Sequence, residues 1–235
     1  MKIGGFQKMS LIDYPGKISA IVFTMGCNFR CPFCHVPQLV DPDMMKDVIM
    51  VPEEEVFSYL KKNRDLIDAV VITGGEPTLQ SDLKEFVKKV KDMGFLVALE
   101  TNGTDFDTLK YLIDKKMLDY VGLDVKNPLT VEKYSKITGG KVDGKVMENI
   151  EKSIEYLVKS NIDYEFRTTL VKEFHDKDSV SEIVQSIKSA KNYYLQNFRL
   201  SEYILSKGKL TPMDESEIDE IAAHVKDSIN VIKRV

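Results

Sequence analysis

The sequence lacks any long uninterrupted run of apolar residues. No stretch approaches the roughly 18 residues that a membrane-spanning helix needs, and no apolar stretch of signal-peptide length follows Met1–Gly5. We therefore expect a cytoplasmic protein with no membrane partner. Low-complexity tracts and linkers are also missing, so we expect one domain over all 235 residues.

The sequence also has no excess of basic charge. Lys and Arg number 33 against 37 Asp and Glu, which gives a net charge of −4. This balance argues against a general nucleic-acid-binding surface, so we expect no nucleic-acid partner. The hydrophobic fraction of 43% and the charged fraction of 30% are typical of an ordinary soluble protein.

Cysteine is scarce, and its few copies are clustered. The only three are Cys27, Cys31 and Cys34. An odd number leaves one without a disulfide partner, and clustered thiols fit a reducing compartment. Thiolates are soft ligands that suit iron–sulfur clusters, copper(I) and zinc. Gly26 and Pro32 argue against a regular helix here, so the spacing predicts a metal-binding loop with inward-facing sulfurs.

Three thiolates leave one coordination position unfilled, and an unfilled position is typical of a catalytic site rather than a structural one. A structural zinc site completed by His35 is the alternative. However, His35 directly follows Cys34, and two consecutive side chains rarely reach one ion. We interpret His35 as a packing or supporting residue.

Strand and helix patterns alternate along the chain. Apolar or β-branched runs predict strands at 19–25, 69–72, 95–99, 120–123, 164–171 and 193–200. Between them, apolar residues at helical spacing predict helices, including a face that contains Leu79, Leu83 and Phe86. About six such units in a parallel sheet favour an α/β fold, as a partial, open (β/α)6 barrel. We place its core at about 17–200 and a C-terminal helical segment at about 212–235.

The cysteine spacing, with Phe33 directly before the third cysteine, resembles the signature of the radical S-adenosylmethionine (SAM) enzymes. The resemblance also implies a partial barrel. It implies that Cys27, Cys31 and Cys34 bind a [4Fe–4S] cluster whose fourth iron is chelated by the amino and carboxylate groups of SAM. Phe33 then lies against the adenine.

Other candidate residues follow predicted strands, where active sites form in parallel α/β folds. Gly74-Gly75-Glu76-Pro77 alone indicates a turn, but it resembles the family segment that hydrogen-bonds the methionine amino group of SAM. Glu100 and Asn102 lie in Glu-Thr-Asn-Gly, which resembles a cofactor-contacting segment of activating enzymes for glycyl-radical proteins. Those enzymes commonly have Asp where this chain has the longer Glu100.

Two further positions carry basic side chains. Asp124-Val125-Lys126 resembles the Asp-x-Lys of the same activating enzymes, whose lysine reaches the carboxylate or ribose of the cofactor. Arg167 resembles an arginine that approaches the methionine moiety, and an arginine among apolar neighbours usually has an anionic partner. The formate acetyltransferase activators carry a histidine near the end of the sixth strand, and this chain does not. We interpret His175 and His224 as surface residues.

The resemblance implies an oxidoreductase reaction. A reduced cluster passes one electron to SAM, which releases methionine and a 5′-deoxyadenosyl radical that abstracts hydrogen from the substrate. With all three cysteines used by one cluster, none is left for an auxiliary cluster or for methyl or sulfur transfer. Such a minimal barrel resembles an activating enzyme, and the resemblance implies a glycine of a partner glycyl-radical enzyme as substrate. The segments 3–17, Cys34-His35 and Phe166–Thr169 resemble activating proteins of anaerobic ribonucleoside-triphosphate reductase. A one-electron donor such as flavodoxin or ferredoxin is implied.

Two alternatives stay open. One is a radical SAM enzyme that acts on a small molecule, similar to 7-carboxy-7-deazaguanine synthase. The other is a non-catalytic iron–sulfur or zinc module. Gly74–Pro77 and Asp124–Lys126 argue against the second, because a passive metal site needs no polar groups at further strand ends.

Overall fold

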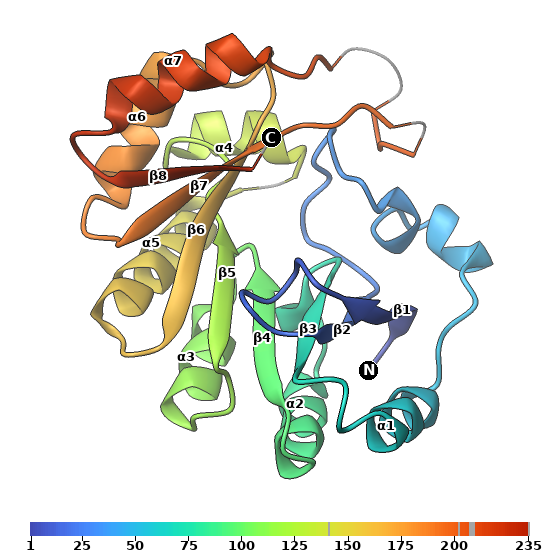
Figure 1. The fold of residues 1–235 in the computed structure, drawn as a ribbon. Coiled ribbons are helices and arrows are strands. Elements are labelled where there is room, and N and C mark those ends of the chain that lie inside the picture. The colour runs from blue at the N-terminus through green and yellow to red at the C-terminus, as the bar shows by residue number, and fades with distance from the viewer. Residues whose placement is uncertain (141, 202, 207–209, 235) are drawn as a thin grey trace. The chain divides into compact units, whose positions relative to one another are not determined.

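The computed structural model describes residues 1–140, 142–201, 203–206 and 210–234. The chain divides into two compact units, which we describe separately. Unit 1 comprises Met1–Asn28, Gln38–Thr101 and Asp105–Gly122, and unit 2 comprises Phe29–Pro37, Asn102–Thr104 and Leu123–Val235. The strands are ordered as in the sequence, from β1 to β8 (Figure 1).

Unit 1 contains a sheet with helices packed on it. Its strands are β1 (Ile3–Ser10), β2 (Ser19–Thr24), β3 (Ala69–Gly74) and β4 (Leu96–Thr101). Its helices are α1 (Glu53–Lys62), α2 (Leu83–Asp92) and α3 (Phe106–Asp114), with short 3₁₀ turns at Met44–Asp47 and Pro77–Leu79. Strand β1 is antiparallel to β2, whereas β2, β3 and β4 are parallel. Helices α1 and α2 lie side by side, with the rings of Phe57 and Phe86 5.1 Å apart.

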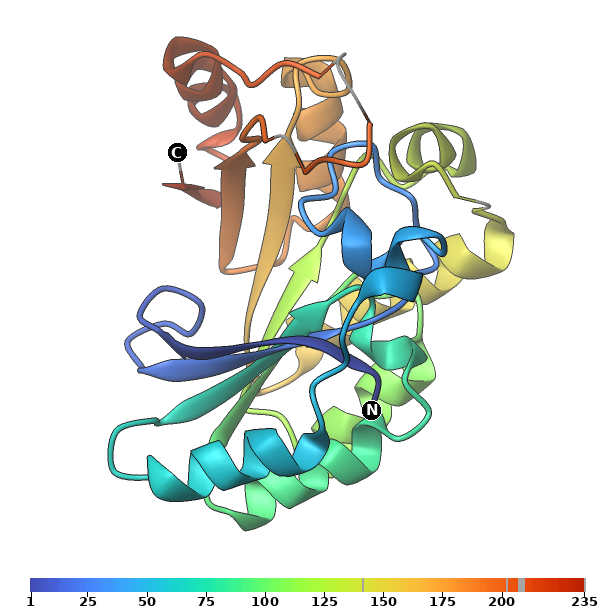
Figure 2. The same ribbon diagram turned by 90° about the vertical axis from the view of Figure 1, so that its right-hand side faces the viewer.

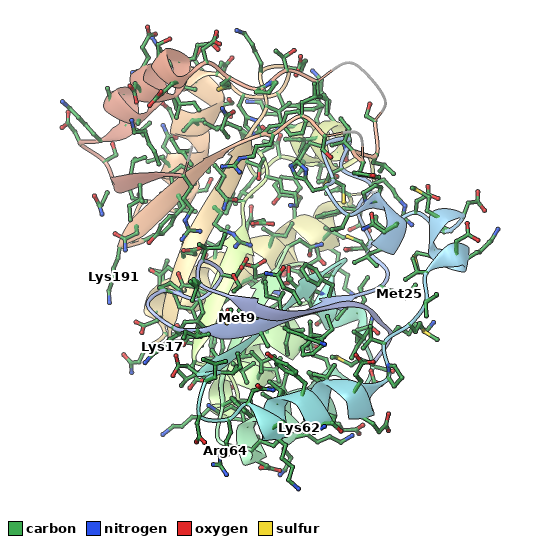
Figure 3. All side chains as sticks on the ribbon, turned by 45° about the vertical axis from the view of Figure 1, so that its right-hand side comes forward. Met9, Lys17, Met25, Lys62, Arg64 and Lys191 are labelled. Carbon is green, nitrogen blue, oxygen red and sulfur yellow. The ribbon has the colours of Figure 1, made fainter. Side chains whose placement is uncertain are left out.

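Strands β1 and β2 show which residues lie at each end of the strands of unit 1. Met9 and Lys17 mark the end at which β1 and β2 are connected, and Met25 lies at the other end, directly after β2 (Figure 3). The cysteine sequence therefore begins at the carboxyl end of a parallel strand. This is the edge at which α/β proteins build their active sites.

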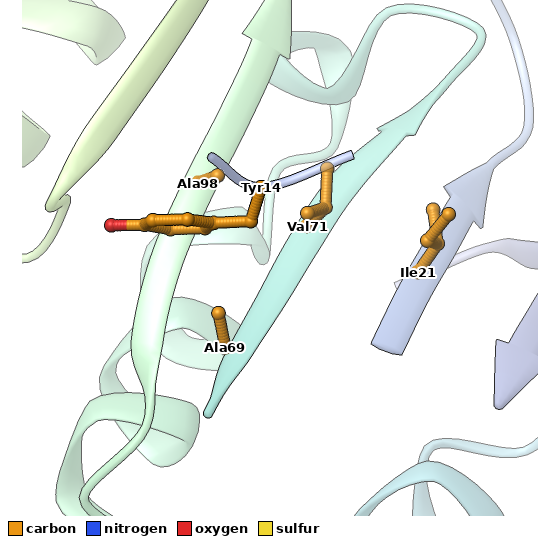
Figure 4. Close-up of a cluster of buried hydrophobic side chains, with 5 residues drawn as sticks. All are labelled: Tyr14, Ile21, Ala69, Val71 and Ala98. Atoms are coloured by element: carbon orange, nitrogen blue, oxygen red, sulfur yellow. The ribbon is translucent and has the colours of Figure 1, made fainter. Parts of the chain in front are cut away.

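A row of small and branched side chains forms the inner face of this sheet. Ile21, Val71 and Ala98 are paired across β2, β3 and β4, so the three side chains point to the same face. Tyr14, from the connection after β1, packs against this row together with Ala69 (Figure 4). Because side chains alternate along a strand, Thr73 and Glu100 lie on the same face, nearer the strand ends.

Unit 2 continues the alternation of helices and strands. Strand β5 (Tyr120–Asp124) begins in unit 1, and its last two residues belong to unit 2. The other elements are α4 (Val131–Thr138), α5 (Gly144–Lys159), β6 (Asp163–Leu170), α6 (Lys177–Ser186), β7 (Asn192–Asn197), α7 (Glu215–Val225) and β8 (Asn230–Arg234). Strands β6, β7 and β8 are parallel, and α6 packs against α7 (Figure 2).

The structure confirms the α/β fold class and agrees with the predicted partial (β/α)6 barrel. All six predicted strands are present, as β2 to β7. The single domain expected over residues 1–235 stays a prediction. Among the described residues, no helix is both long enough and apolar enough to span a membrane.

Several expectations about local structure were wrong. The segment at about 212–235 is not helical throughout. Helix α7 ends at Val225, and strand β8 follows it. Two helices, α4 and α5, lie between β5 and β6, where the alternation of strands and helices implies one. Leu79 is 48% exposed in the turn before α2. His175, expected at the surface, is buried at 4% exposure because both ring nitrogens contact backbone groups.

Leu99 of β4, a buried residue on the face of the sheet opposite to Ala98, provides a test of the packing. We expect Leu99→Ala to lower the free energy of unfolding by about 2–5 kcal/mol, because it leaves a cavity at a fully buried position. The matched control, Leu79→Ala, removes an equal number of atoms from an exposed position and should change stability by less than about 0.5 kcal/mol. Urea unfolding followed by circular dichroism measures both. Equal losses would contradict the assigned packing.

Candidate active site

The cysteine loop begins in unit 1, where backbone hydrogen bonds hold its first residues. The N–H of Met25 donates to the carbonyl of Lys2 at 2.9 Å, and that of Gly26 donates to Leu39 at 2.7 Å. The side-chain amide of Gln80 donates to the carbonyl of Met25 at 2.7 Å. Gly26 has φ +92°, a conformation that residues with a side chain rarely adopt. The position before Cys27 is therefore fixed by both strand-end and loop contacts.

The two glycines after β3 lie directly against this segment. Gly75 donates to the carbonyl of Thr24 at 2.8 Å, and Glu76 donates to that of Gly26 at the same distance. A Cβ atom on Gly75 would lie 2.0 Å from the carbonyl oxygen of Gly26, and one on Gly74 would lie 2.4 Å from the backbone of Thr24. Glycine is thus required here because two backbones touch, a reason that the turn interpretation did not include.

Glu76 is buried, and hydroxyl groups surround one of its carboxylate oxygens. Its Oε1 accepts hydrogen bonds from the hydroxyls of Thr78 and Thr101, both at 2.6 Å, and from the N–H of Thr78 at 3.1 Å. Glu100 lies at the end of the neighbouring strand, where its carboxylate accepts from the hydroxyl of Thr73 at 2.8 Å. Two acidic side chains therefore have fixed orientations at the carboxyl ends of β3 and β4.

The later part of the cysteine loop belongs to unit 2 and is held by the end of α4. The N–H of Arg30 donates to the carbonyl of Thr138 at 2.7 Å. Gly139 ends this helix in the left-handed conformation, and a Cβ atom there would lie 2.4 Å from the carbonyl oxygen of Arg30. On another side, Ser206 donates to the carbonyl of Pro32 at 2.9 Å.

The two thiols of unit 2, those of Cys31 and Cys34, differ in how deeply they are buried. Cys31 is buried, and burial raises the pKa of its thiol to about 11, although Lys126 acts in the opposite direction. Burial also raises the pKa of Cys34. Neither of these nor Cys27 is in a disulfide. The ring of His35 packs 5.7 Å from that of Phe198, which agrees with a packing role.

Three charged side chains meet at the ends of β5 and β6. Asp124 accepts a hydrogen bond from the Nε of Arg167 at 2.9 Å and pairs with the Nζ of Lys126 at 3.2 Å. The expected anionic partner of Arg167 is thus Asp124, with the buried Glu165 3.7 Å away. Lys126 also lies over the ring of Phe33, 5.9 Å from its centroid. The two cations, Lys126 and Arg167, thus share the carboxylate of Asp124, and Arg167 also pairs with that of Glu165.

The electrostatics of the group follow from its burial and pairing. Burial alone would raise the pKa of Asp124, but Arg167 and Lys126 outweigh it and hold that pKa below its usual value. For Lys126, burial would lower the pKa, but Asp124 and the Cys31 sulfur raise it above its usual value. Both side chains are therefore charged at neutral pH.

Asn102 is also in unit 2, and its side chain is used locally. Its Oδ1 accepts hydrogen bonds from the N–H and the hydroxyl of Thr104, at 3.1 and 2.7 Å. In this arrangement the Asn102 side chain closes a local Asx turn. Its contact with a cofactor stays a prediction.

Two buried residues near Lys126 were missed in the sequence. Tyr134 of α4 and His175, which follows β6, both bond to the backbone of Lys126. A sequence signal for α4 existed, since Val131, Tyr134 and Ile137 have helical spacing between the capping Thr130 and Gly139. No comparable signal marked His175.

The region that contains the cysteine loop and the charged group of Asp124, Lys126 and Arg167 matches a known family. A family model described as the Radical SAM superfamily matches residues 21–179. The chain belongs to this superfamily. As such it is a radical SAM enzyme, and the family implies a [4Fe–4S] cluster and SAM as its cofactors.

Two relatives and one solved structure are similar. Two proteins of Methanocaldococcus jannaschii, both named "Putative glycyl-radical enzyme activating enzyme", are 35% and 32% identical to this chain. The alignments cover 99% and 79% of this chain and 95% and 68% of those proteins. The crystal structure of Streptococcus suis SuiB has a TM-score of 0.68 at 18% identity. That match covers 92% of this chain but only 48% of SuiB, and it shows the fold alone.

The donor set fits the implied cluster. Three thiols, which are the soft ligands that iron–sulfur clusters take, lie in one loop. A cation, Lys126, lies close enough to the thiol of Cys31 to oppose the rise in its pKa. Within the described ranges, no three His, Cys, Asp or Glu side chains are arranged to hold a metal ion. The cofactor assignment therefore depends on the family and on the ligand chemistry.

The contact between Gly75 and Gly26 generates a prediction. We expect Gly75→Ala to displace the start of the cysteine loop, and so to lower stability by about 1–3 kcal/mol and to reduce iron binding. Gly144→Ala is the matched control, because a Cβ atom there meets nothing within 4 Å. Iron per chain after anaerobic reconstitution and the melting temperature measure the effect. Full iron loading in a stable Gly75→Ala protein would argue against the constraint.

Proposed function

We propose that this radical SAM enzyme activates a glycyl-radical enzyme by abstracting hydrogen from one of its glycines. The observation that carries the proposal is the 35% identity to a protein of that printed name across 99% of this chain and 95% of the relative. The proposal also agrees with the presence of only three cysteines, all in one loop.

In this proposal Cys27, Cys31 and Cys34 bind the cluster. When bound, the cluster and SAM supply a one-electron reductive cleavage that yields methionine and a 5′-deoxyadenosyl radical. The protein supplies position and exclusion of water. Burial of Cys31 and of the neighbouring Phe33, at 8% and 5% exposure, supports such exclusion on the side that these residues form.

The remaining residues are proposed to orient SAM. Lys126 and Arg167 are cations, which suits an interaction with the methionine carboxylate. Gly74, Gly75 and Glu76 are proposed to meet the methionine amino group, an ammonium that a buried carboxylate would attract. Phe33 is proposed to lie against the adenine, and Glu100 and Asn102 to complete the contacts.

The substrate is proposed to be a protein whose glycine loses one hydrogen atom. The 5′-deoxyadenosyl radical takes a hydrogen atom from a glycine Cα and becomes 5′-deoxyadenosine. The glycine keeps the unpaired electron. The electron that cleaves SAM comes from a donor such as flavodoxin or ferredoxin. For the partner we propose anaerobic ribonucleoside-triphosphate reductase, to which the sequence resemblance points.

Deuterium transfer tests the proposal directly. The protein, reconstituted anaerobically and reduced with dithionite, is mixed with SAM and with anaerobic ribonucleoside-triphosphate reductase labelled with α-deuterated glycine. We expect deuterium in 5′-deoxyadenosine, measured by mass spectrometry, and a glycyl radical signal in electron paramagnetic resonance.

The matched control is Cys31→Ala, which should lose the reaction by at least about a hundredfold because one cluster ligand is missing. Unlabelled 5′-deoxyadenosine without a glycyl radical would rule out this partner and favour a small-molecule substrate. If an intact cluster forms and no SAM is cleaved with any partner, glycyl-radical activation is wrong.

A further inference from the structure

The peptide of Lys126 is held from both sides by buried rings of unit 2. Its N–H donates to the hydroxyl oxygen of Tyr134 at 3.1 Å, and its carbonyl lies 3.0 Å from the Nε2 of His175. Tyr134 is fully buried and His175 is only 4% exposed. Water therefore has little access to replace either ring, so loss of one bond leaves a backbone group without a partner.

The tautomer of His175 follows from its other contact. The N–H of Val171 donates to Nδ1 at 3.0 Å, so Nδ1 carries no proton. The proton of the neutral ring is then on Nε2, which donates it to the carbonyl of Lys126. His175 thereby connects the backbone after β6 with the backbone after β5.

The preceding residue is held in the same way. The N–H of Val125 donates to the carbonyl of Arg167 at 2.8 Å, and its carbonyl accepts from the hydroxyl of Thr168 at 2.5 Å. Tyr134 also donates, at 3.5 Å, to the carbonyl of Asp124. Four different side chains or backbone groups thus fix three consecutive residues where β5 ends.

Such a fixed backbone matters because lysine has a long, flexible side chain. The ammonium group of Lys126 has one carboxylate partner, Asp124, at 3.2 Å and one aromatic ring, Phe33, at 5.9 Å. Neither contact alone defines where the flexible stem begins. The position of the Cα atom of Lys126 does so, and the two rings hold that position together with the bonds to Val125.

We propose that His175 and Tyr134 are positioning residues that set the location of the Lys126 ammonium group for SAM. The inference rests on the proposed function, in which Lys126 meets the carboxylate or ribose of SAM. Neither ring needs to touch SAM. Each acts through a hydrogen bond to the backbone of the lysine.

Two substitutions of His175 separate its two bonds. The amide of Asn reaches about as far as Nδ1, so His175→Asn keeps the bond from Val171 and loses the one to Lys126. Gln reaches about as far as Nε2, so His175→Gln keeps a donor for Lys126. Equilibrium dialysis of radiolabelled SAM with the cluster-loaded, unreduced protein measures Kd without turnover. We expect a Kd about tenfold higher for His175→Asn and within about twofold of the wild type for His175→Gln.

Tyr134→Phe is a second, independent variant. It removes the hydroxyl that accepts from Lys126 and keeps the ring, which packs edge-on against Phe29 with centroids 6.1 Å apart. We expect its Kd for SAM to rise about tenfold as well. His224→Asn is the matched control on the exposed surface of α7 and should bind SAM as the wild type does.

Lys126→Ala separates failure of the inference from failure of the proposed role of the lysine. If Lys126→Ala binds SAM as tightly as the wild type, Lys126 does not meet SAM and the inference falls with that role. If Lys126→Ala binds weakly while both His175→Asn and Tyr134→Phe bind normally, the lysine role stands and the positioning inference is wrong. If His175→Asn and His175→Gln lose SAM affinity equally, and their melting temperatures fall to the same extent, His175 has only a structural role.

Discussion

The structure around the candidate site depends on one constraint, which is that the cysteine loop has no helix or strand to satisfy its backbone. Its hydrogen-bonding groups must therefore find partners elsewhere. In unit 1 the backbone of Gly26 bonds to Leu39 and Glu76, and in unit 2 that of Arg30 bonds to Thr138. These bonds bring backbones so close that Gly75 and Gly139 have no room for a side chain. The residues that border the loop must therefore allow two backbones to touch, in addition to any contact that they make with a cofactor.

A second constraint is charge in a buried setting. Arg167 pairs with Asp124, and the neighbouring Glu165 forms two hydrogen bonds of 2.7 Å with Arg234 of β8. A buried charge without a partner is costly, so the loss of one member destabilises the other. Arg234 also lies over the ring of Tyr194, which fixes the last strand to β7. The same network places the cation Lys126 beside Phe33 and Cys31, where an anionic cofactor group is proposed to bind.

The sequence predicted β2 and β3 well because their apolar runs are nearly continuous and end at a polar residue or glycine, as at Gly74. It failed where a residue's surroundings come from distant segments. Leu79 fits the helical spacing, but the chain forms a 3₁₀ turn before α2 begins, and this leaves its side chain in solvent. His175 looks like a polar surface residue until the backbones after β5 and β6 are seen to need its two nitrogens. Strand β8 is short and mixed in polarity, and it is recognisable only by its pairing with β7.

Taken alone, the sequence determined three features: three thiols at a spacing that resembles the radical SAM signature, an α/β alternation, and polar residues placed after strands. These features are local, since each depends on residue type and on spacing along the chain. The tertiary structure decided which partners those residues have. Arg167 pairs with Asp124. Tyr134 and His175 form hydrogen bonds to the backbone of Lys126. Such contacts join residues far apart in the chain, and only folding brings their hydrogen-bonding groups within reach.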